Sequence, residues 1–415
     1  MLLHKSKLSA YTVYLIFSGV TSLSGSLIST VNMVYQVETA RLNPLQLVLV
    51  GTVLELVAFV CQLPTGVLAD IYSRRLAVIL GTLLFGMAFV LEGSFPRFDV
   101  ILVSQILFGI GATLSDGAEQ AWITDEVGEM RIGHVFLRST QVGLLAGLLG
   151  AIISVGLASI RINIPIVIGG ALSIGVAGFL LLFMPENNFH PISKAERRTW
   201  RDMGNTFRSG LHVVRGRPIL ITILLIALFY GLYSEGFDRL WTAHFLTNFT
   251  FPTLGQLKPV VWFGIISVVG TLLTLGATEV VRLWVNIAQQ RILIRALFVI
   301  NFLAIMCLLV FALVGNFFLA VAAVLLFKVF RTVNDPVYTT WLTQNIEAKV
   351  RATVISMRGQ VDAFGQIVGG PPVGYIGTTF SIQTALLASC ALLSPVLFLY
   401  AYAARKAREK LPQPS

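Results

Sequence analysis

The sequence predicts an all-α membrane protein with twelve transmembrane helices. Hydrophobic residues make up 56% of the 415 residues and charged residues only 12%, whereas soluble domains average about 25% charged residues. Twelve apolar runs are each long enough to cross a bilayer, which takes about 20 helical residues. One polar, basic stretch divides the runs into six and six. This composition excludes a soluble globular domain, a disordered chain and a disulfide scaffold.

The twelve runs follow one another closely, and turns as short as Gly315-Asn316 make consecutive helices antiparallel neighbours. The first run is too long for a signal peptide and has no small-residue cleavage site, so we expect an uncleaved helix. The predicted spans are Leu8–Tyr35, Leu45–Ala69, Leu76–Gly93, Asp99–Trp122, Val135–Ala158, Ile164–Met184, Ile219–Asn248, Lys258–Arg282, Ile292–Val314, Asn316–Leu342, Ala352–Thr378 and Ile382–Ala404.

Basic residues predict the orientation and the domain organisation. About 23 of the 30 Lys and Arg residues fall on the side of the two termini, and cytoplasmic loops carry such an excess. We therefore expect a multi-pass protein of the inner or plasma membrane with both termini in the cytoplasm. The same rule accounts for the net charge of +10 without nucleic-acid binding. The expected organisation is a six-helix bundle (1–184), a basic cytoplasmic linker (185–217) with an amphipathic helix near 195–214, a second six-helix bundle (218–404) and a tail (405–415).

An internal repeat relates the two predicted bundles. The segment Asp116–Thr124, DGAEQAWIT, matches Asp335–Thr343, DPVYTTWLT, about 219 residues further on. Parallel six-helix repeats of this kind build one class of secondary transporter. The repeat therefore predicts two pseudo-symmetric bundles. Further residues recur at matching places downstream: Arg131 with Arg351, Arg138 with Arg358, and Gly150 with Gly370.

The loop between the second and third spans resembles the most specific motif of the major facilitator superfamily. The family pattern is roughly G-x-L-A-D-R-x-G-R-R, and residues 66–75 read GVLADIYSRR, with departures at Ile71 and Ser73. The resemblance extends over about residues 8–404 and implies the major facilitator fold. It also implies a charge relay that latches one conformational state, whereas the alternative is a set of ordinary inner-loop charges. The implied latch residues are Gly66, Asp70, Arg74, Arg75 and Asp125.

The similarity to the drug/proton antiporter branch of that family is weaker. Gln105 stands four residues before Gly109, where many members carry an arginine linked with proton movement. Leu148 replaces the proline of the antiporter glycine pattern in the fifth span. Both departures weaken the expectation that the chain belongs to this branch.

Ionisable residues inside the predicted spans are the candidate functional groups, because a charge in hydrocarbon costs at least about 2.5–3.5 kcal/mol. Glu55 and Asp362 lie about ten residues into the second and eleventh spans, and the resemblance implies that these spans touch. Burial disfavours the charged form of a carboxyl group, so either residue could carry a proton. The alternative is a hydrogen-bonded structural role.

The seventh, fourth and tenth spans supply further charges. Glu235 and Asp238 share one face of the seventh span and lie beside Arg239. We favour Glu235 as an acid of the central cavity that binds a cation or a proton. The alternative is that it belongs to an outer salt-bridge network. The resemblance implies that the fourth and tenth spans line a central cavity, so their opposite charges could form a gate. The alternative is a local pair of Arg331 with Asp335 four residues on. The gate and cavity candidates are Asp116, Glu119, Lys328, Arg331, Asp335 and Tyr338.

The predicted function is proton-coupled export of small lipophilic or drug-like molecules. The alternative is proton-coupled or facilitative uptake of a nutrient or metabolite, and a membrane-embedded sensor or enzyme is less favoured. Three cysteines and five histidines are scattered without ligand spacing, so we expect no catalytic residue, metal or cofactor. The expected partners are the substrate, protons and the lipid bilayer, with no nucleic acid, and the expected state is a monomer.

Overall fold

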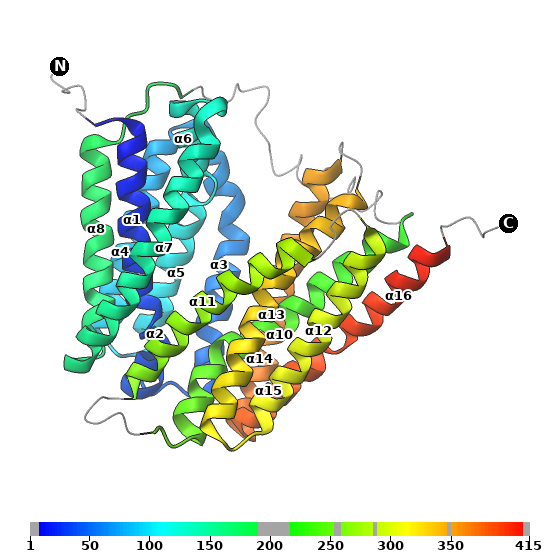
Figure 1. Ribbon diagram of the computed structural model, residues 1–415. Coiled ribbons are helices and arrows are strands. Elements are labelled where there is room, and N and C mark those ends of the chain that lie inside the picture. Colours follow the sequence, from blue (N-terminus) through cyan, green and yellow to red (C-terminus); the bar gives the residue numbers. More distant parts are fainter. Residues whose placement is uncertain (1–7, 190–215, 253–258, 285–288, 347–349, 410–415) are drawn as a thin grey trace. The chain divides into compact units, whose positions relative to one another are not determined.

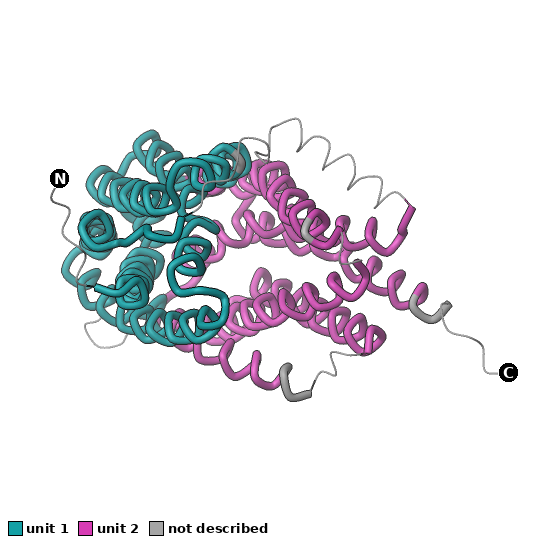
Figure 2. The backbone as a smooth tube through the Cα atoms, turned by 90° about the horizontal axis from the view of Figure 1, so that it is seen from above, with its two compact units in different colours: residues 1–42, 53–198, 253–265 teal, residues 43–52, 199–252, 266–415 magenta. Residues whose placement is uncertain are grey.

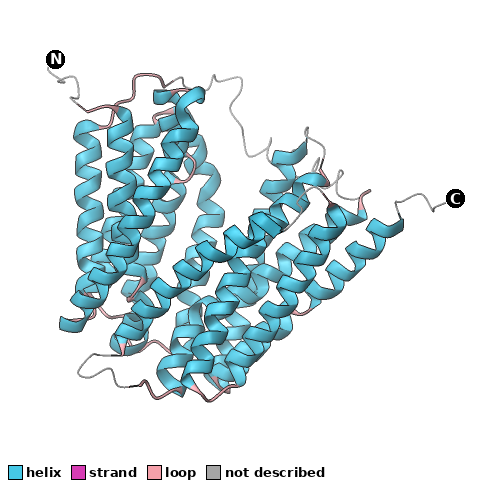
Figure 3. Ribbon diagram, in the orientation of Figure 1, coloured by secondary structure: helices cyan, strands magenta, loops and turns pink. Residues whose placement is uncertain are grey.

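The computed structural model describes residues 8–189, 216–252, 259–284, 289–346 and 350–409, and these ranges contain helices joined by loops, with no strand (Figure 3). Eleven helices of the described residues are long and apolar enough to cross a membrane. The predicted all-α membrane class is therefore confirmed. The predicted linker helix near 195–214 lies outside the described residues.

Two compact units make up the chain (Figure 2). Unit 1 comprises residues 1–42, 53–198 and 253–265, and unit 2 comprises residues 43–52, 199–252 and 266–415. Helices α3 and α11 therefore each contribute to both units.

The first half of the chain forms the helices that Figure 1 colours from blue to green. The run of α1, α2 and the π-helical turn η1 makes one span, Ala10–Thr39. Ser9 caps α1 by accepting a hydrogen bond from the backbone N–H of Thr12, as capping residues do. The bounds are α1 Ala10–Ser29, α2 Asn32–Val34, η1 Tyr35–Thr39, α3 Pro44–Ile71, α4 Arg74–Ser94, α5 Phe98–Ser115, α6 Ala118–Val127, α7 Glu129–Ile160 and α8 Ile164–Phe183.

The second half begins at Pro218, a residue whose fixed φ and missing N–H suit the first turn of a helix. Its bounds are α10 Pro218–Asn248, α11 Val260–Trp284, α12 Gln290–Leu313, α13 Phe317–Gln344, α14 Arg351–Thr379, α15 Ile382–Leu393 and α16 Pro395–Glu409. Helix α14 carries Arg351, Arg358 and Asp362 and is the long helix of this half that falls short of membrane-span composition.

Three predicted spans are divided in the structure. The first breaks at Thr30 and Val31, between α1 and α2. The fourth breaks between α5 and α6 at Gly117, whose φ of 75° is accessible chiefly to glycine. Asp116 at the end of α5 and Glu119 in α6 therefore lie on opposite sides of a helix break, although the sequence predicts one continuous span through both. The twelfth span divides into α15 and α16 at Ser394, just before Pro395, a residue that cannot donate a helical hydrogen bond.

Close helix contacts in unit 2 place the charged helices side by side. A Cβ on Gly365 of α14 would lie 2.6 Å from the carbonyl oxygen of Leu228 and 3.0 Å from the Cα of Gly231 on α10. Small residues let membrane helices approach this closely. The backbones of α10 and α14 are therefore in near contact at this point.

Candidate functional site

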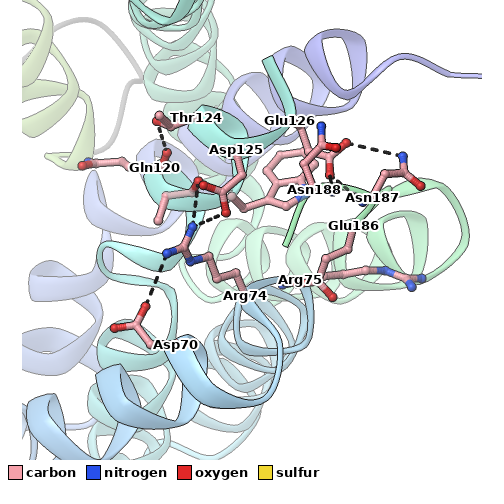
Figure 4. Close-up of polar contacts among 12 residues, drawn as sticks. Asp70, Arg74, Arg75, Gln120, Thr124, Asp125, Glu126, Glu186, Asn187 and Asn188 are labelled. Atoms are coloured by element: carbon pink, nitrogen blue, oxygen red, sulfur yellow. Dashed lines mark hydrogen bonds and ion pairs between the residues drawn. The ribbon is translucent and has the colours of Figure 1, made fainter. Parts of the chain in front are cut away.

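Arg74 is the centre of a polar cluster at the start of α4 in unit 1 (Figure 4). Its guanidinium donates to the Asp125 carboxylate of α6 and to the carbonyl oxygen of Ala121 at 3.3 Å. Asp70 of α3 forms a longer ion pair with it at 3.6 Å. The Arg74 side chain is only 18% exposed. The structure thus brings three of the predicted latch residues together, while their action as a latch stays a prediction.

The two other residues of the predicted latch lie apart from this ion pair. Arg75 donates from its guanidinium to the carbonyl oxygen of Leu181 at 2.6 Å. A Cβ on Gly66 would meet no atom within 4 Å in the part of the chain that the structure describes. Nothing in the described residues therefore explains a glycine at position 66.

Glu186 is a member of this cluster that the sequence analysis missed. Its carboxylate accepts a hydrogen bond from the backbone N–H of Arg75 at 2.9 Å and one from the Ser73 hydroxyl at 2.7 Å. A carboxylate at a helix N-terminus is stabilised by the helix dipole. Nearby, Glu126 accepts the backbone N–H groups of Asn187 and Asn188 at 2.6 and 3.0 Å (Figure 4). These hydrogen bonds hold the segment after α8 against the start of α4 and the end of α6.

In unit 2, the side chains of Arg331 on α13 and Asp238 on α10 form a two-pronged ion pair, with N–O distances of 2.5 and 2.8 Å. Asp335 pairs instead with Arg358 of α14 at 2.5 Å. The alternative of a local pair between Arg331 and Asp335 is therefore wrong. Both arginines reach other helices, because a long side chain can find a partner across a helix interface as readily as along its own helix.

Glu235 pairs with Arg239 one turn along α10, at 2.8 Å. Glu235 is 4% exposed, and a methyl group on Gly51, in the part of α3 that belongs to unit 2, would overlap its carboxylate. The interpretation of Glu235 as an open cavity acid is therefore corrected: the residue is enclosed and already neutralised by Arg239. The alternative, membership in a salt-bridge network, describes Glu235 better.

Lys328 and Asp362 differ from the other charges of unit 2. The Lys328 ammonium lies over the indole ring of Trp241, 3.5 Å from its centroid, and makes no hydrogen bond or ion pair among the described residues. Asp362 accepts a hydrogen bond from the neutral Gln366 amide at 2.9 Å. Neither charge is therefore cancelled by a paired side chain of opposite sign within the described part of the unit.

Tyr338 is enclosed by unit 2 itself. Its ring is 3% exposed, its hydroxyl donates to the carbonyl oxygen of Ile223 at 2.6 Å, and the Arg358 guanidinium lies 4.7 Å from the ring centroid. It therefore supports the pair of Arg358 with Asp335 and does not present a free hydroxyl.

The remaining candidates belong to unit 1. Asp116 is exposed at the end of α5, Glu119 is partly exposed on α6, and Glu55 is partly exposed near the middle of α3. Their predicted partners, the tenth-span charges and Asp362, belong to unit 2. The gate and the approach of Glu55 to Asp362 therefore stay predictions.

An apolar hollow of about 430 Å³ lies between α1 and α8 of unit 1, lined by residues such as Ile16, Ile168 and Phe179. It contains none of the candidate residues. The candidate residues of the described chain lie instead among the ionic side chains of α10, α13 and α14, in the Arg74 cluster, and at Glu55, Asp116 and Glu119.

Comparisons with known proteins agree with the fold described above. The chain is 21% identical over 400 residues to an uncharacterized transporter of major facilitator type, YxaM of Bacillus subtilis (strain 168), with 94% of each chain covered. A bacterial homologue of the human lysosomal transporter Spinster, in an inward-facing and unoccupied conformation, shares the fold with a TM-score of 0.73 at 14% identity, covering 98% of both chains. The nucleoside transporter NupG gives 0.72 at 13%, covering 96% of this chain and 100% of that one.

The resemblance seen in the sequence is thereby confirmed at the level of the family. The twelve-helix architecture fits the helices of this chain, and the antiporter branch remains an expectation. Because the family's sequence model matches residues 11–370, the chain belongs to the Major Facilitator Superfamily and is a multi-pass membrane transporter.

Proposed function

We propose that the protein exports small lipophilic or drug-like molecules in exchange for protons, by alternating access. The observation that carries this proposal is a set of charged side chains on α10, α13 and α14, here called the ionic layer. In it, Lys328 and Asp362 have no paired countercharge among the described residues of the unit. The layer consists of Glu235, Asp238, Arg239, Lys328, Arg331, Asp335, Arg358 and Asp362. Charges inside membrane helices are costly and are retained where they meet a substrate, an ion or a proton. Trp241, Tyr233 and Tyr338 supply aromatic surface next to these charges.

Asp362 is the proton carrier that the contacts favour. Arg239 and Arg331 hold Glu235 and Asp238 as ion pairs, and a nearby cation stabilises the ionised form of an acid. Asp362 has a neutral amide as its hydrogen-bond donor, and Arg331 and Arg358 act on it without forming an ion pair among the described residues. It can therefore alternate between the charged and the neutral form at lower cost than an ion-paired acid. Glu55 of unit 1 is the second candidate.

The Arg74 cluster is the conformational latch of the proposal. Breaking an ion pair of partly exposed groups costs on the order of 1 kcal/mol or less. Such an energy is suited to biasing two states of similar free energy, because a much stronger contact would lock one of them. We also propose that the protein is a monomer of the cell membrane with cytoplasmic termini. Its proposed partners are the substrate, protons and the lipid bilayer, with no nucleic acid.

Uptake of a nutrient or metabolite is the second candidate. The polarity of the unit 2 layer favours it, since Lys328, Arg331 and Asp335 suit a polar, charged molecule as well as a lipophilic one. Proton coupling and direction separate the two candidates.

The test uses purified protein in vesicles with an imposed pH gradient and two probes, ethidium and uridine. Exchange with protons predicts that ethidium accumulates inside vesicles with an acidic lumen, and that a proton ionophore abolishes the accumulation. Accumulation of uridine from an acidic exterior would establish proton-coupled uptake instead. Equilibration without accumulation would indicate facilitated diffusion and would overturn proton coupling.

The role of Glu55 is tested in the same vesicles with Glu55→Gln. Loss of the pH dependence of transport is the expected result if Glu55 shares the coupling with Asp362. Transport that keeps the same pH dependence would remove Glu55 from the coupling mechanism.

A further inference from the structure

Lys328 is a cation inside the membrane-spanning helix α13, and its close partner is an aromatic ring. Its ammonium lies 3.5 Å from the centroid of the Trp241 ring of α10 and makes no hydrogen bond or ion pair among the described residues. An ammonium carries three N–H donors, and a ring face replaces only a fraction of the hydration that a buried cation loses. Lys328 therefore retains donors for a further acceptor.

The nearby charges do not cancel the charge of Lys328. Asp238 and Arg331 are the charged side chains that act on it. Asp238, however, gives both carboxylate oxygens to the Arg331 guanidinium, at 2.5 and 2.8 Å. The pair of Glu235 with Arg239, at 2.8 Å, adds no net charge. One acid and two cations thus leave a single positive charge beside Trp241.

The face of α13 that carries Lys328 is polar and accessible. Arg331, Thr332 and Asp335 follow three, four and seven residues on, so they share this face of the helix. Each of the four side chains is exposed or partly exposed. Charged residues of membrane helices face a water-filled space or a partner and not lipid. This face is therefore a surface on which a polar group of a ligand can bind.

The surroundings of the ammonium favour one class of anion. A single positive charge is matched by a monoanion, whereas a dianion would leave a charge uncompensated inside the membrane span. A lysine ammonium is a point charge and lacks the two-pronged geometry of a guanidinium, so it can hold a carboxylate through one oxygen. Trp241 is partly exposed and offers aromatic surface to an apolar remainder of the ligand.

We propose that Lys328 and Trp241 form a subsite for the carboxylate of a lipophilic monocarboxylate. The ammonium donates to the carboxylate on the side away from the indole, because the face of an aromatic ring is negative and repels an anion. The inference rests on the proposed function in taking the ionic layer as the place where the substrate binds, and it names a substrate class for this part of the layer. A cation such as ethidium does not use this subsite.

The test is equilibrium binding of radiolabelled benzoate to the purified full chain in lipid nanodiscs, at neutral pH and without a gradient. Benzoate is expected to bind saturably, and benzamide, which has the same ring without the charge, is expected to compete poorly. Lys328→Met removes the charge and keeps an unbranched side chain. Its affinity for benzoate should fall about ten-fold or more, which is what the loss of a hydrogen bond to a charged group costs.

Lys406→Met is the matched control, because it removes a lysine of α16 outside the ionic layer; its affinity for benzoate should be unchanged. Lys328→Arg keeps the positive charge and should retain binding. Equal affinity of the wild type and Lys328→Met for benzoate overturns the proposal. The absence of saturable binding to the wild type overturns it as well.

A second measurement decides the matter if Lys328→Met does not fold. A carboxylate bound to the ammonium alters the electric field at the indole ring, so benzoate should change the tryptophan fluorescence of the wild type and benzamide should not. This change should be lost in Trp241→Phe, which keeps an aromatic ring. A change that persists in Trp241→Phe would place the anion elsewhere and overturns the proposal.

The two proposals fail separately. Binding of benzoate through Lys328 without proton exchange in the vesicles would remove the proposed function and leave the subsite. Proton exchange in the vesicles, together with benzoate binding that does not depend on Lys328, would remove the subsite alone.

Discussion

The repeated segments of the two halves share a pattern but differ in backbone. In the first half, Asp116 is followed by Gly117, whose positive φ ends α5 and lets α6 begin in a new direction. In the second half, Asp335 is followed by Pro336, and α13 continues through it as one helix. The two halves thus differ at the residue after the shared aspartate. The helix breaks where this residue is Gly117 and continues where it is Pro336.

The partners of the repeated residues differ as well. Arg358 of the second half pairs with Asp335 of another helix. Its counterpart in the first half, Arg138, donates to Gln141 on its own helix at 3.2 Å. The indole N–H of Trp122 donates to the carbonyl oxygen of Pro185 at 2.6 Å. A sequence repeat therefore preserves the positions of chemical groups while each half forms its own contacts.

The interiors of the units show a wider contrast. In unit 1, hydroxyl groups join the helices, as where Ser24 donates to the carbonyl oxygen of Gly169 at 2.5 Å and Ser154 donates to that of Leu27 at 2.7 Å. In unit 2, ion pairs join or brace the same kind of membrane helix. We therefore expect unit 2 to be more sensitive to the loss of an enclosed charged partner, such as Arg239, than unit 1 is to the loss of one hydroxyl.

The largest effect is expected for Arg239→Ala in unit 2. It leaves the enclosed Glu235 without its ion-pair partner, and breaking a buried pair costs about 3–5 kcal/mol. Thermal unfolding of the purified protein in detergent measures the loss. Arg97→Ala is the matched control, since its pair with Asp99 is 70% and 64% exposed. Equal destabilisation by both variants would contradict the assignment.

Gly117→Ala comes next and tests the backbone difference between the repeats. A side chain at a φ of 75° costs about 1–2 kcal/mol, so the unfolding temperature should fall. Gly147→Ala is the control: it lies inside α7, its Cβ would meet nothing within 4 Å, and alanine favours a helix by about 1 kcal/mol. A fall for Gly147→Ala alone would reverse the interpretation.

Ser24→Ala should have a smaller effect, because a hydrogen bond between membrane helices contributes about 0.6 kcal/mol on average. Ser173 keeps its own contact with the carbonyl oxygen of Gly169 at 3.1 Å. Ser159→Ala, which removes a bond within α7, controls for the loss of any hydroxyl. If Ser24→Ala destabilised the protein as strongly as Arg239→Ala, the contrast between the units would not hold.

Asp335→Asn is expected to change stability least. The Asp335 side chain is 65% exposed, and exposed ion pairs contribute about 0–1 kcal/mol. Unfolding temperatures within the error of the wild type are the expected outcome, and a drop as large as that of Arg239→Ala would show that the pair is enclosed in the working protein.

Much of the fold follows from the sequence because a bilayer demands long apolar helices, so the spans and the membrane class were predictable. The contact of Arg74 with Asp125 followed from a family motif. The partner of Arg331 did not, since spacing along one helix cannot show which neighbouring helix faces it. Glu186 was missed because it lies outside the spans.

The most direct test of the account compares two transport assays for Asp362→Asn in vesicles. Counterflow of a preloaded substrate needs no net proton movement, whereas accumulation against a concentration gradient needs it. If Asp362 carries the coupled proton, the variant keeps counterflow and loses accumulation driven by the pH gradient. Accumulation at the wild-type level would contradict the account.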